Sequence, residues 1–190
     1  MVIPKAAKGA EARKPTDLEK KIAADITVLE AENNLLKELK ALQFIAVREF
    51  DVGSGRKAAV IYVPFPQLGE WRKLQKPFME GMEKKLGVNT QVLVMGQRTM
   101  VSSEGWKRSG KLSGVRPRSR TLKAVQQATL DDLVFPAEIT GKRTRVKADG
   151  SRLLKVHLSK KEETAMDSRL GAIANVFKQI CSKDISFEFV

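Results

Sequence analysis

Residues that build common reactive sites are scarce in this chain of 190 residues, which has one histidine and one cysteine. A single His157 rules out a metal cluster of several histidines, and no Ser–His–Asp triad is recognisable. On a strand between apolar neighbours, His157 is expected to be structural, with contact to RNA as the alternative. Cys181 cannot form an internal disulfide framework, fits a reducing compartment and is expected to be a small core residue. The sequence therefore predicts neither an enzyme, nor a cofactor, nor a small-molecule substrate.

Long apolar runs are also lacking. The longest, Ala58–Phe65, contains a proline and has eight residues, whereas a helix that crosses a bilayer needs about 20. Residues 1–16 have no apolar segment typical of a signal peptide. We expect a soluble intracellular protein without a membrane partner. Its hydrophobic content of 42% is ordinary for a globular protein, and we predict one domain over residues 16–190 after a flexible basic arm at 1–15.

Positive charge is concentrated in one part of the chain. The net charge is +13, and +9 of it falls between Arg98 and Lys155, with 14 basic and five acidic residues. Such a density repels itself unless a polyanion compensates it, and nucleic acid suits that role. The candidate RNA-binding residues are Arg98, Lys107, Arg108, Lys111, Arg116, Arg118, Arg120, Lys123, Lys142, Arg143, Arg145, Lys147, Arg152 and Lys155.

A loop predicted at residues 99–120 carries the densest part of this charge. Between Lys107 and Lys123 there are seven Lys and Arg residues and no Asp or Glu. Arginine can clamp phosphate with two hydrogen bonds or stack on bases, and Pro117 stiffens the backbone that presents the arginines. Trp106 could stack on an unpaired base or anchor local packing, and the sequence favours neither. The plain alternative for the loop is a solvated charge run.

A long helix is predicted at the start of the domain. A capping box, Thr16-x-x-Glu19, opens it, and apolar residues at helical spacing continue to about Leu42. Asn33 interrupts this stripe. Packing on the protein's own sheet is the expected reason for the stripe, and a coiled coil with a polar register residue is the alternative.

A hairpin–helix–strand unit is predicted next. Strands at 45–52 and 57–63 are joined by a glycine-rich turn, and the second strand is apolar on both faces, so it should be central and covered on both sides. A helix follows over residues 68–86, which Pro77 should kink or break. A strand at 91–95 completes the unit.

The second half repeats this order. We predict strands at 145–148, 153–158 and 185–189, and helices at 121–133 and after a capping box, Ser159-x-x-Glu162. Ile173 and Phe177 lie mid-stripe on the last helix and should be buried. The last strand alternates strictly, which indicates one wet face. The predicted fold class is therefore α/β of the α+β type. It has two hairpin–helix–strand halves around a mixed, largely antiparallel sheet, plus the long N-terminal helix and the basic loop.

Two motifs resemble reactive sites without meeting their requirements. Residues 105–111 have the spacing of a phosphate-binding loop, but Leu112 replaces the hydroxyl that holds magnesium, and no buried strand precedes the motif. Nucleotide binding is therefore not expected. Asp131 and Asp132 are adjacent on a predicted helix, where side chains point about 100° apart and do not converge on one atom. Salt bridges to nearby arginines or plain solvation are the expected roles of these carboxylates.

Several ungapped runs resemble one known family. The runs RPRSRTL at 116–122, LDDLVFPAEI at 130–139, GKRTRVKADGSRLLKVHL at 141–158 and GSGRKAAVIYVPFPQL at 53–68 are similar to segments of the eukaryote-specific small-subunit ribosomal protein seven family. The resemblance covers about residues 16–189. It departs from the family at residues 100–114, where the loop is less densely basic, and at Pro77.

This resemblance implies a non-catalytic protein of the small (40S) ribosomal subunit that binds 18S ribosomal RNA. It also implies neighbouring 40S proteins and pre-ribosomal assembly factors as partners, and a cytoplasmic location with a nucleolar stage of rRNA processing. The family's basic runs place RNA contacts at Arg116, Arg118, Arg120, Lys142, Arg143, Arg145, Arg152 and Lys155. The alternative function is a free-standing RNA-binding or RNA-processing factor that acts transiently.

Overall fold

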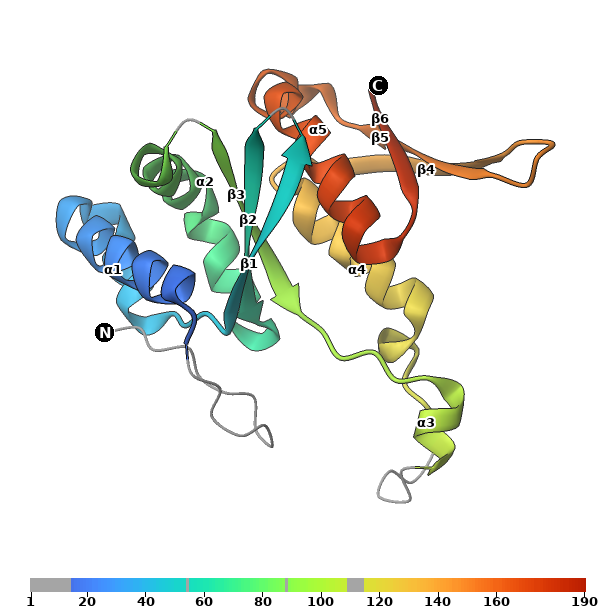
Figure 1. Cartoon of the computed structure of the whole chain (residues 1–190), viewed down its shortest axis with the longest axis horizontal. Helices are drawn as coiled ribbons and strands as arrows, with labels where there is room; N and C mark the ends of the chain where they lie inside the picture. Colours follow the sequence, from blue (N-terminus) through green and yellow to red (C-terminus); the bar gives the residue numbers. More distant parts are fainter. Residues whose placement is uncertain (1–14, 54, 88, 109–114) are drawn as a thin grey trace.

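Helices and strands follow one another from Asp17 to Phe189 in the computed structural model (Figure 1), which describes residues 15–53, 55–87, 89–108 and 115–190. The helices are α1 (Asp17–Glu32), α2 (Leu68–Leu86), α3 (Ser103–Arg108), α4 (Leu122–Val134) and α5 (Glu163–Cys181). The strands are β1 (Ala46–Gly53), β2 (Arg56–Pro64), β3 (Thr90–Gln97), β4 (Ile139–Val146), β5 (Arg152–Leu158) and β6 (Asp184–Phe189). Short 3₁₀ helices are η1 (Asn34–Ala41), η2 (Phe65–Gln67), η3 (Arg118–Arg120) and η4 (Lys160–Glu162).

The six strands form two separate sheets of three, in the orders β1-β2-β3 and β4-β5-β6. In each sheet a hairpin supplies an antiparallel pair, and the strand after the crossover helix lies parallel to the middle strand. The predicted α+β class and the repeated hairpin–helix–strand order are confirmed. The strands form two mixed sheets rather than one largely antiparallel sheet, because each hairpin gains a parallel third strand through its crossover helix. Strand β2 is central and buried along most of its length, as its apolar character indicated.

Helices and sheets alternate in layers (Figure 1). One apolar core joins α1, η1 and α2 to the face of the first sheet that carries Ile61, Val63, Val92 and Val94. A second core joins the opposite face of that sheet to α4 and α5, and these two helices to β5 of the second sheet. Helices α4 and α5 thus lie between the two sheets, and Ile173 and Phe177 of α5 are buried there as predicted.

The N-terminal helix is shorter than predicted. The capping box forms, because Thr16 Oγ1 accepts a hydrogen bond from the backbone N–H of Glu19 at 3.3 Å and the Glu19 side chain bonds back to Thr16 at 2.9 Å. The α-helix ends at Glu32, since Asn33 has extended backbone angles (φ −117°, ψ 118°). The side chain of Asn competes for backbone hydrogen bonds, and Asn therefore favours helix ends and turns over helix interiors. The apolar stripe nevertheless continues through η1 to Leu42 and packs in the protein's own core, as expected.

Three other features differ from the predictions: the continuity of one helix, the cap of another and the start of one strand. Helix α2 runs unbroken through Pro77, and the carbonyl oxygen that Pro77 leaves without a donor belongs to Lys73, an exposed residue that water can reach. Helix α5 begins at Glu163 after the turn η4, without a side-chain cap, so the second capping box is wrong. Strand β4 begins at Ile139, six residues earlier than predicted. Residues 1–14 of the predicted basic arm lie outside the described residues.

Candidate nucleic-acid interface

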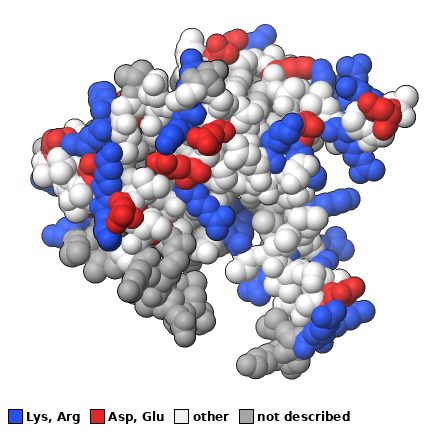
Figure 2. Space-filling view, in the orientation of Figure 1, with Lys and Arg blue, Asp and Glu red and all other residues white. Residues whose placement is uncertain are grey.

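Two projections of the molecule carry Lys and Arg side chains, in addition to those on the body. Figure 2 shows them along the hairpin of β4 and β5 and around the segment that carries α3, both of which extend away from the layered body in Figure 1. Residues 143–152, which form the end of the hairpin, are all exposed. A projecting cationic surface is accessible to a large polyanion in a way that a cleft is not.

The strand register sets which basic residues share a face of the hairpin. Arg143 pairs with Lys155, and Arg145 pairs with Leu153. Paired residues of antiparallel strands point to the same side, so Arg143, Arg145 and Lys155 lie on the outer face of the second sheet. The opposite face carries Leu154 and Val156, which pack in the second core. The hairpin is thus apolar inside and basic outside.

Most cations of the hairpin have no partner of their own. Arg143, Arg145, Lys147 and Arg152 are exposed and make no side-chain hydrogen bond or ion pair with any described residue. Lys155, in contrast, pairs with Glu188 of β6. The charges at the tip are therefore free to meet phosphates without breaking an internal contact.

The hairpin turn is fixed by its own polar groups. Gly150 adopts a positive φ of 82°, and its N–H donates to the Lys147 carbonyl oxygen at 3.0 Å. Asp149 accepts hydrogen bonds from the Ser151 N–H at 2.9 Å and the Ser151 hydroxyl at 2.8 Å. These bonds to Ser151 lower the pKa of Asp149. Asp149, the single acidic residue of the tip, is thus hydrogen-bonded within the turn.

A second group of cations lies at the start of α4. The N–H of Val101 donates to the carbonyl oxygen of Arg120 at 3.1 Å, and Nη1 of Arg116 donates to the carbonyl oxygen of Val101 at 3.2 Å. These two bonds close the base of the predicted loop. They leave Arg118, Arg120 and Lys123 exposed, and the side chains of these three residues have no partner among the described residues.

The loop predicted at residues 99–120 contains the short helix α3. Arg108 pairs with Glu104 at 3.2 Å, and both side chains are exposed. Lys107 is exposed, and Trp106 is half-buried. Gly105, the first residue of the motif that resembles a phosphate-binding loop, is helical, which differs from the loop such a motif requires. Lys111 and the rest of residues 109–114 lie outside the described residues.

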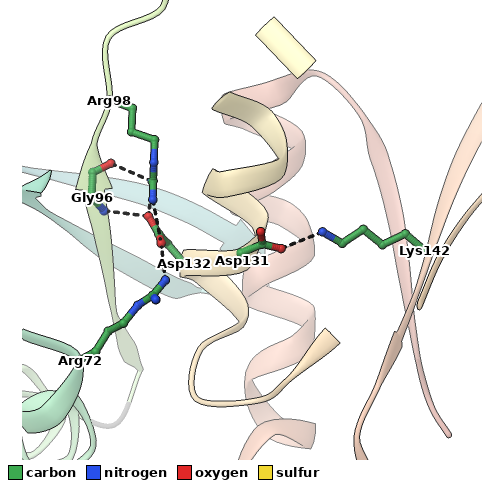
Figure 3. Close-up of polar contacts among 6 residues, drawn as sticks. All are labelled: Arg72, Gly96, Arg98, Asp131, Asp132 and Lys142. Carbon is green, nitrogen blue, oxygen red and sulfur yellow. Dashed lines mark hydrogen bonds and ion pairs between the residues drawn. The ribbon is translucent and has the colours of Figure 1, made fainter. Parts of the chain in front are cut away.

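Arg98 lies in an internal network (Figure 3). Its two terminal nitrogens contact the carboxylate of Asp132, which also accepts hydrogen bonds from Nη2 of Arg72 at 2.9 Å and from the Gly96 N–H at 3.1 Å. The side chain of Asp132 is 1% exposed and that of Arg98 is 15% exposed. A side chain at Gly96 would place its Cβ 3.2 Å from Asp132 Oδ2, so glycine permits this close approach.

The two adjacent aspartates have separate structural roles, as predicted. Asp131 points away from Asp132 and pairs with Lys142 of β4 at 2.7 Å (Figure 3). Lys142 and Arg98 are thus held by carboxylates, unlike the hairpin tip. Arg72 was not singled out from the sequence, because its position among the other basic residues of α2 carries no signal until the fold brings it to Asp132.

In the part of the chain that the structure describes, the remaining reactive side chains are not gathered into a site. His157 lies on the outer face of the second sheet, with Nδ1 3.7 Å from Glu188 Oε2. Burial raises the pKa of the Cys181 thiol, which is half-buried. Across the described residues, no three His, Cys, Asp or Glu side chains are placed to hold a metal ion. Within the same residues, no helix has both the length and the apolar character needed to cross a bilayer.

The fold and these surfaces define a basic α+β protein with exposed cations on two projections. A family model described as "Ribosomal protein S7e" matches residues 6–189. The chain belongs to this family, which confirms the resemblance seen in the sequence.

Similar proteins are named small ribosomal subunit protein eS7. The protein of Drosophila melanogaster is 43% identical over 175 residues, which are 92% of this chain and 89% of that protein. The Dictyostelium discoideum protein is 40% identical over 174 residues, again 92% and 89% of the two chains. The Schizosaccharomyces pombe protein is 38% identical over 176 residues with the same shares.

Proposed function

We propose that this protein is a non-catalytic constituent of the small ribosomal subunit and binds 18S ribosomal RNA through its two basic projections. The family membership and the name of its relatives support the assignment to the subunit. The observation that carries RNA binding is a set of exposed cations that form no hydrogen bond or ion pair with the described residues. These are Arg143, Arg145, Lys147 and Arg152 on the hairpin, and Arg118, Arg120 and Lys123 near the start of α4.

The proposed mechanism is neutralisation of phosphates at two places at once. Each exposed cation that contacts a phosphate releases counterions from the RNA, and arginine adds directional hydrogen bonds. The hairpin and the start of α4 belong to different projections of the molecule (Figure 1). Two such surfaces can hold two RNA segments together, and this supports assembly of the subunit. Arg98 and Lys142 are left out of these proposed contacts because carboxylates of the protein already hold them.

Sucrose-gradient fractionation of cells tests this function. We expect the tagged protein to sediment with 40S subunits and polysomes, and the double variant Arg143→Glu/Arg145→Glu to be depleted from them. Lys37→Glu/Lys40→Glu on η1 is the matched control with the same change of charge at exposed sites outside the projections. Equal incorporation of the hairpin variant and the wild type would contradict RNA binding by the hairpin.

We propose that the protein acts in two compartments, the nucleolus and the cytoplasm. The protein enters pre-ribosomes in the nucleolus, contacts assembly factors and neighbouring 40S proteins, supports rRNA processing, and then remains in cytoplasmic subunits. The alternative is a free-standing RNA-binding or RNA-processing factor that acts transiently. A protein confined to the light fractions of the gradient would favour that alternative. Accumulation of rRNA precursors after depletion of the protein would support the processing role.

A further inference from the structure

A groove lies where the first sheet's two parallel strands end. Strands β2 and β3 are parallel, with Pro64 in register with Gln97. The chain leaves β2 toward α2, which covers one face of the sheet, and leaves β3 toward α4, which packs on the other face. Ligand sites of open sheets with parallel strands form at such a point, because the two connections diverge and leave a crevice at the carboxyl ends of the strands.

Six residues that line this groove combine an aromatic ring, small side chains and polar groups. The groove has a volume of about 440 Å³, within the usual range for small ligands. These residues are Phe65, Gln97, Arg98, Arg120, Ala124 and Ala128. The two alanines lie one turn apart on α4 and leave room beside the helix.

The aromatic ring of Phe65 is exposed and also held in place. Phe65 is 60% exposed, so much of the apolar surface of its ring is not used for burial in the core. The guanidinium carbon of Arg98 lies 5.4 Å from the centroid of the ring, within the distance for a cation–π contact. Arg98 is itself fixed by the buried Asp132. The network of Figure 3 therefore orients an aromatic platform at the surface.

Positive charge lies beside this platform. Arg120 lines the groove, and Arg118 and Lys123 are exposed beside it along the chain; their side chains have no partner among the described residues. An exposed ring with adjacent cations matches the chemistry of an unpaired nucleotide, whose base stacks and whose phosphate is anionic. An apolar peptide has no negative charge to pair with these cations.

We propose that the groove binds one unpaired nucleotide of RNA, with its base stacked on Phe65 and its phosphate held by Arg120. This inference rests on the proposed RNA-binding function and adds to it a contact that recognises single-stranded RNA. The hairpin cations neutralise phosphates of either paired or unpaired RNA, whereas the groove accepts only a base that is free to leave the stack.

The test compares Phe65→Leu with Phe65→Trp in the full-length protein. Leucine keeps apolar bulk and removes the aromatic face, and tryptophan keeps the face. The probes are a 12-nucleotide oligouridylate and a fully paired RNA duplex. We expect Phe65→Leu to weaken binding of oligouridylate by roughly tenfold, in the range measured for loss of one base–aromatic stack. Binding of the duplex and the dependence on salt should not change, because no phosphate contact is lost.

Phe65→Trp supplies the positive control. It should bind oligouridylate as the wild type does, and its added fluorescence should be quenched by the stacked base. Equal affinity of Phe65→Leu and wild type for oligouridylate would overturn the inference, as would equal weakening for both probes. A groove that instead holds an apolar peptide predicts that Phe65→Leu leaves RNA binding unchanged.

Different results would contradict the proposed nucleotide groove and the proposed RNA-binding function. If Arg143→Glu/Arg145→Glu weakens binding of both probes while Phe65→Leu changes nothing, RNA binding stands and the groove does not. If the wild-type protein binds neither probe above the level of a neutral protein, RNA binding itself fails. Thermal melting of each variant controls for folding, and the exposure of Phe65 predicts little change there.

Discussion

Asp132 accepts a hydrogen bond from Arg72 at 2.9 Å between Oδ1 and Nη2, and this bond joins helices from the two halves of the chain. Arg72 belongs to α2, and Asp132 belongs to α4. The guanidinium of Arg72 also lies 5.3 Å from the ring centroid of Phe135, just after α4. The buried carboxylate therefore ties the second half of the molecule to the carboxyl edge of the first sheet.

Asp132→Ala should destabilise the protein by about 3 kcal/mol, the lower end of the range for removal of one partner from a buried ion pair. The lower end is expected because the side chain of Arg72 is 38% exposed and can regain water. Chemical denaturation measures this change. The control is Asp131→Ala, at the neighbouring position, whose single partner Lys142 and 44% exposure predict a loss under about 1 kcal/mol. Equal losses would contradict the role of the network.

Phe177→Ala should destabilise the protein by about 3–5 kcal/mol, because it empties an aromatic site in a packed core. Phe177 is 1% exposed between the two sheets. Thermal or urea unfolding measures the loss. Val28→Ala, on the exposed side of α1, serves as the control and should change stability by no more than about 0.5 kcal/mol. A Phe177→Ala variant that melts like the wild type would show that the core of α5 is assigned wrongly.

Arg118→Ala/Arg120→Ala should reduce the salt dependence of RNA binding. If each arginine contacts one phosphate, the slope of log affinity against log salt should fall in magnitude by roughly 1.4–1.8 units. Binding across a series of KCl concentrations measures it. Arg116→Ala is the comparison, since its guanidinium holds the Val101 carbonyl oxygen. We expect that variant to affect the base of the loop more than the slope.

The stability of the second sheet should depend on pH through Glu188. The hydrogen bond from Lys155 is the main cause that lowers the pKa of Glu188 from its ordinary value of 4.5, with further lowering by the charges of Lys155, His157 and Arg145. A lowered pKa contributes stability above the ordinary value, and this contribution is lost as the pH falls through the lowered pKa. The melting temperature should therefore fall on acidification from pH 6 to pH 3 by more in the wild type than in Glu188→Gln. Equal falls in the two proteins would count against this ion pair.

The three strands of the first sheet and helix α2 were predictable from the sequence to within two residues, whereas the N-terminal helix ends ten residues earlier than predicted. Strands β2 and β3 contain continuous apolar runs, which are typical of strands buried on both faces. Strand β4 was predicted six residues too late, since its exposed basic residues hide the alternation that burial produces. Helix α3 was missed for a related reason, because its described residues are exposed or half-buried and carry no apolar stripe.

The basic segments of the candidate site could be predicted from the sequence. Which of their cations are held by other residues could not. The density of basic residues indicated the hairpin and the start of α4, but composition cannot tell an unpaired arginine from one that is held internally. Arg98 and Arg145 look alike in the sequence. Asp132, 34 residues from Arg98 along the chain, reaches it only after the two halves have packed. The exposure of Phe65, inside an otherwise apolar run, likewise depends on where β2 ends.

The place of α5 between the two sheets has a consequence for the order of synthesis. Ala58, Val60, Leu93 and Met95 form an apolar face in the first half, and α5 belongs to the core that covers it. On this helix, Asn175 and Gln179 donate hydrogen bonds to carbonyl oxygens of β1 at 2.8 Å each. Part of this apolar face therefore stays uncovered in a growing chain until α5 has been made, and such exposed surface favours aggregation of incomplete chains.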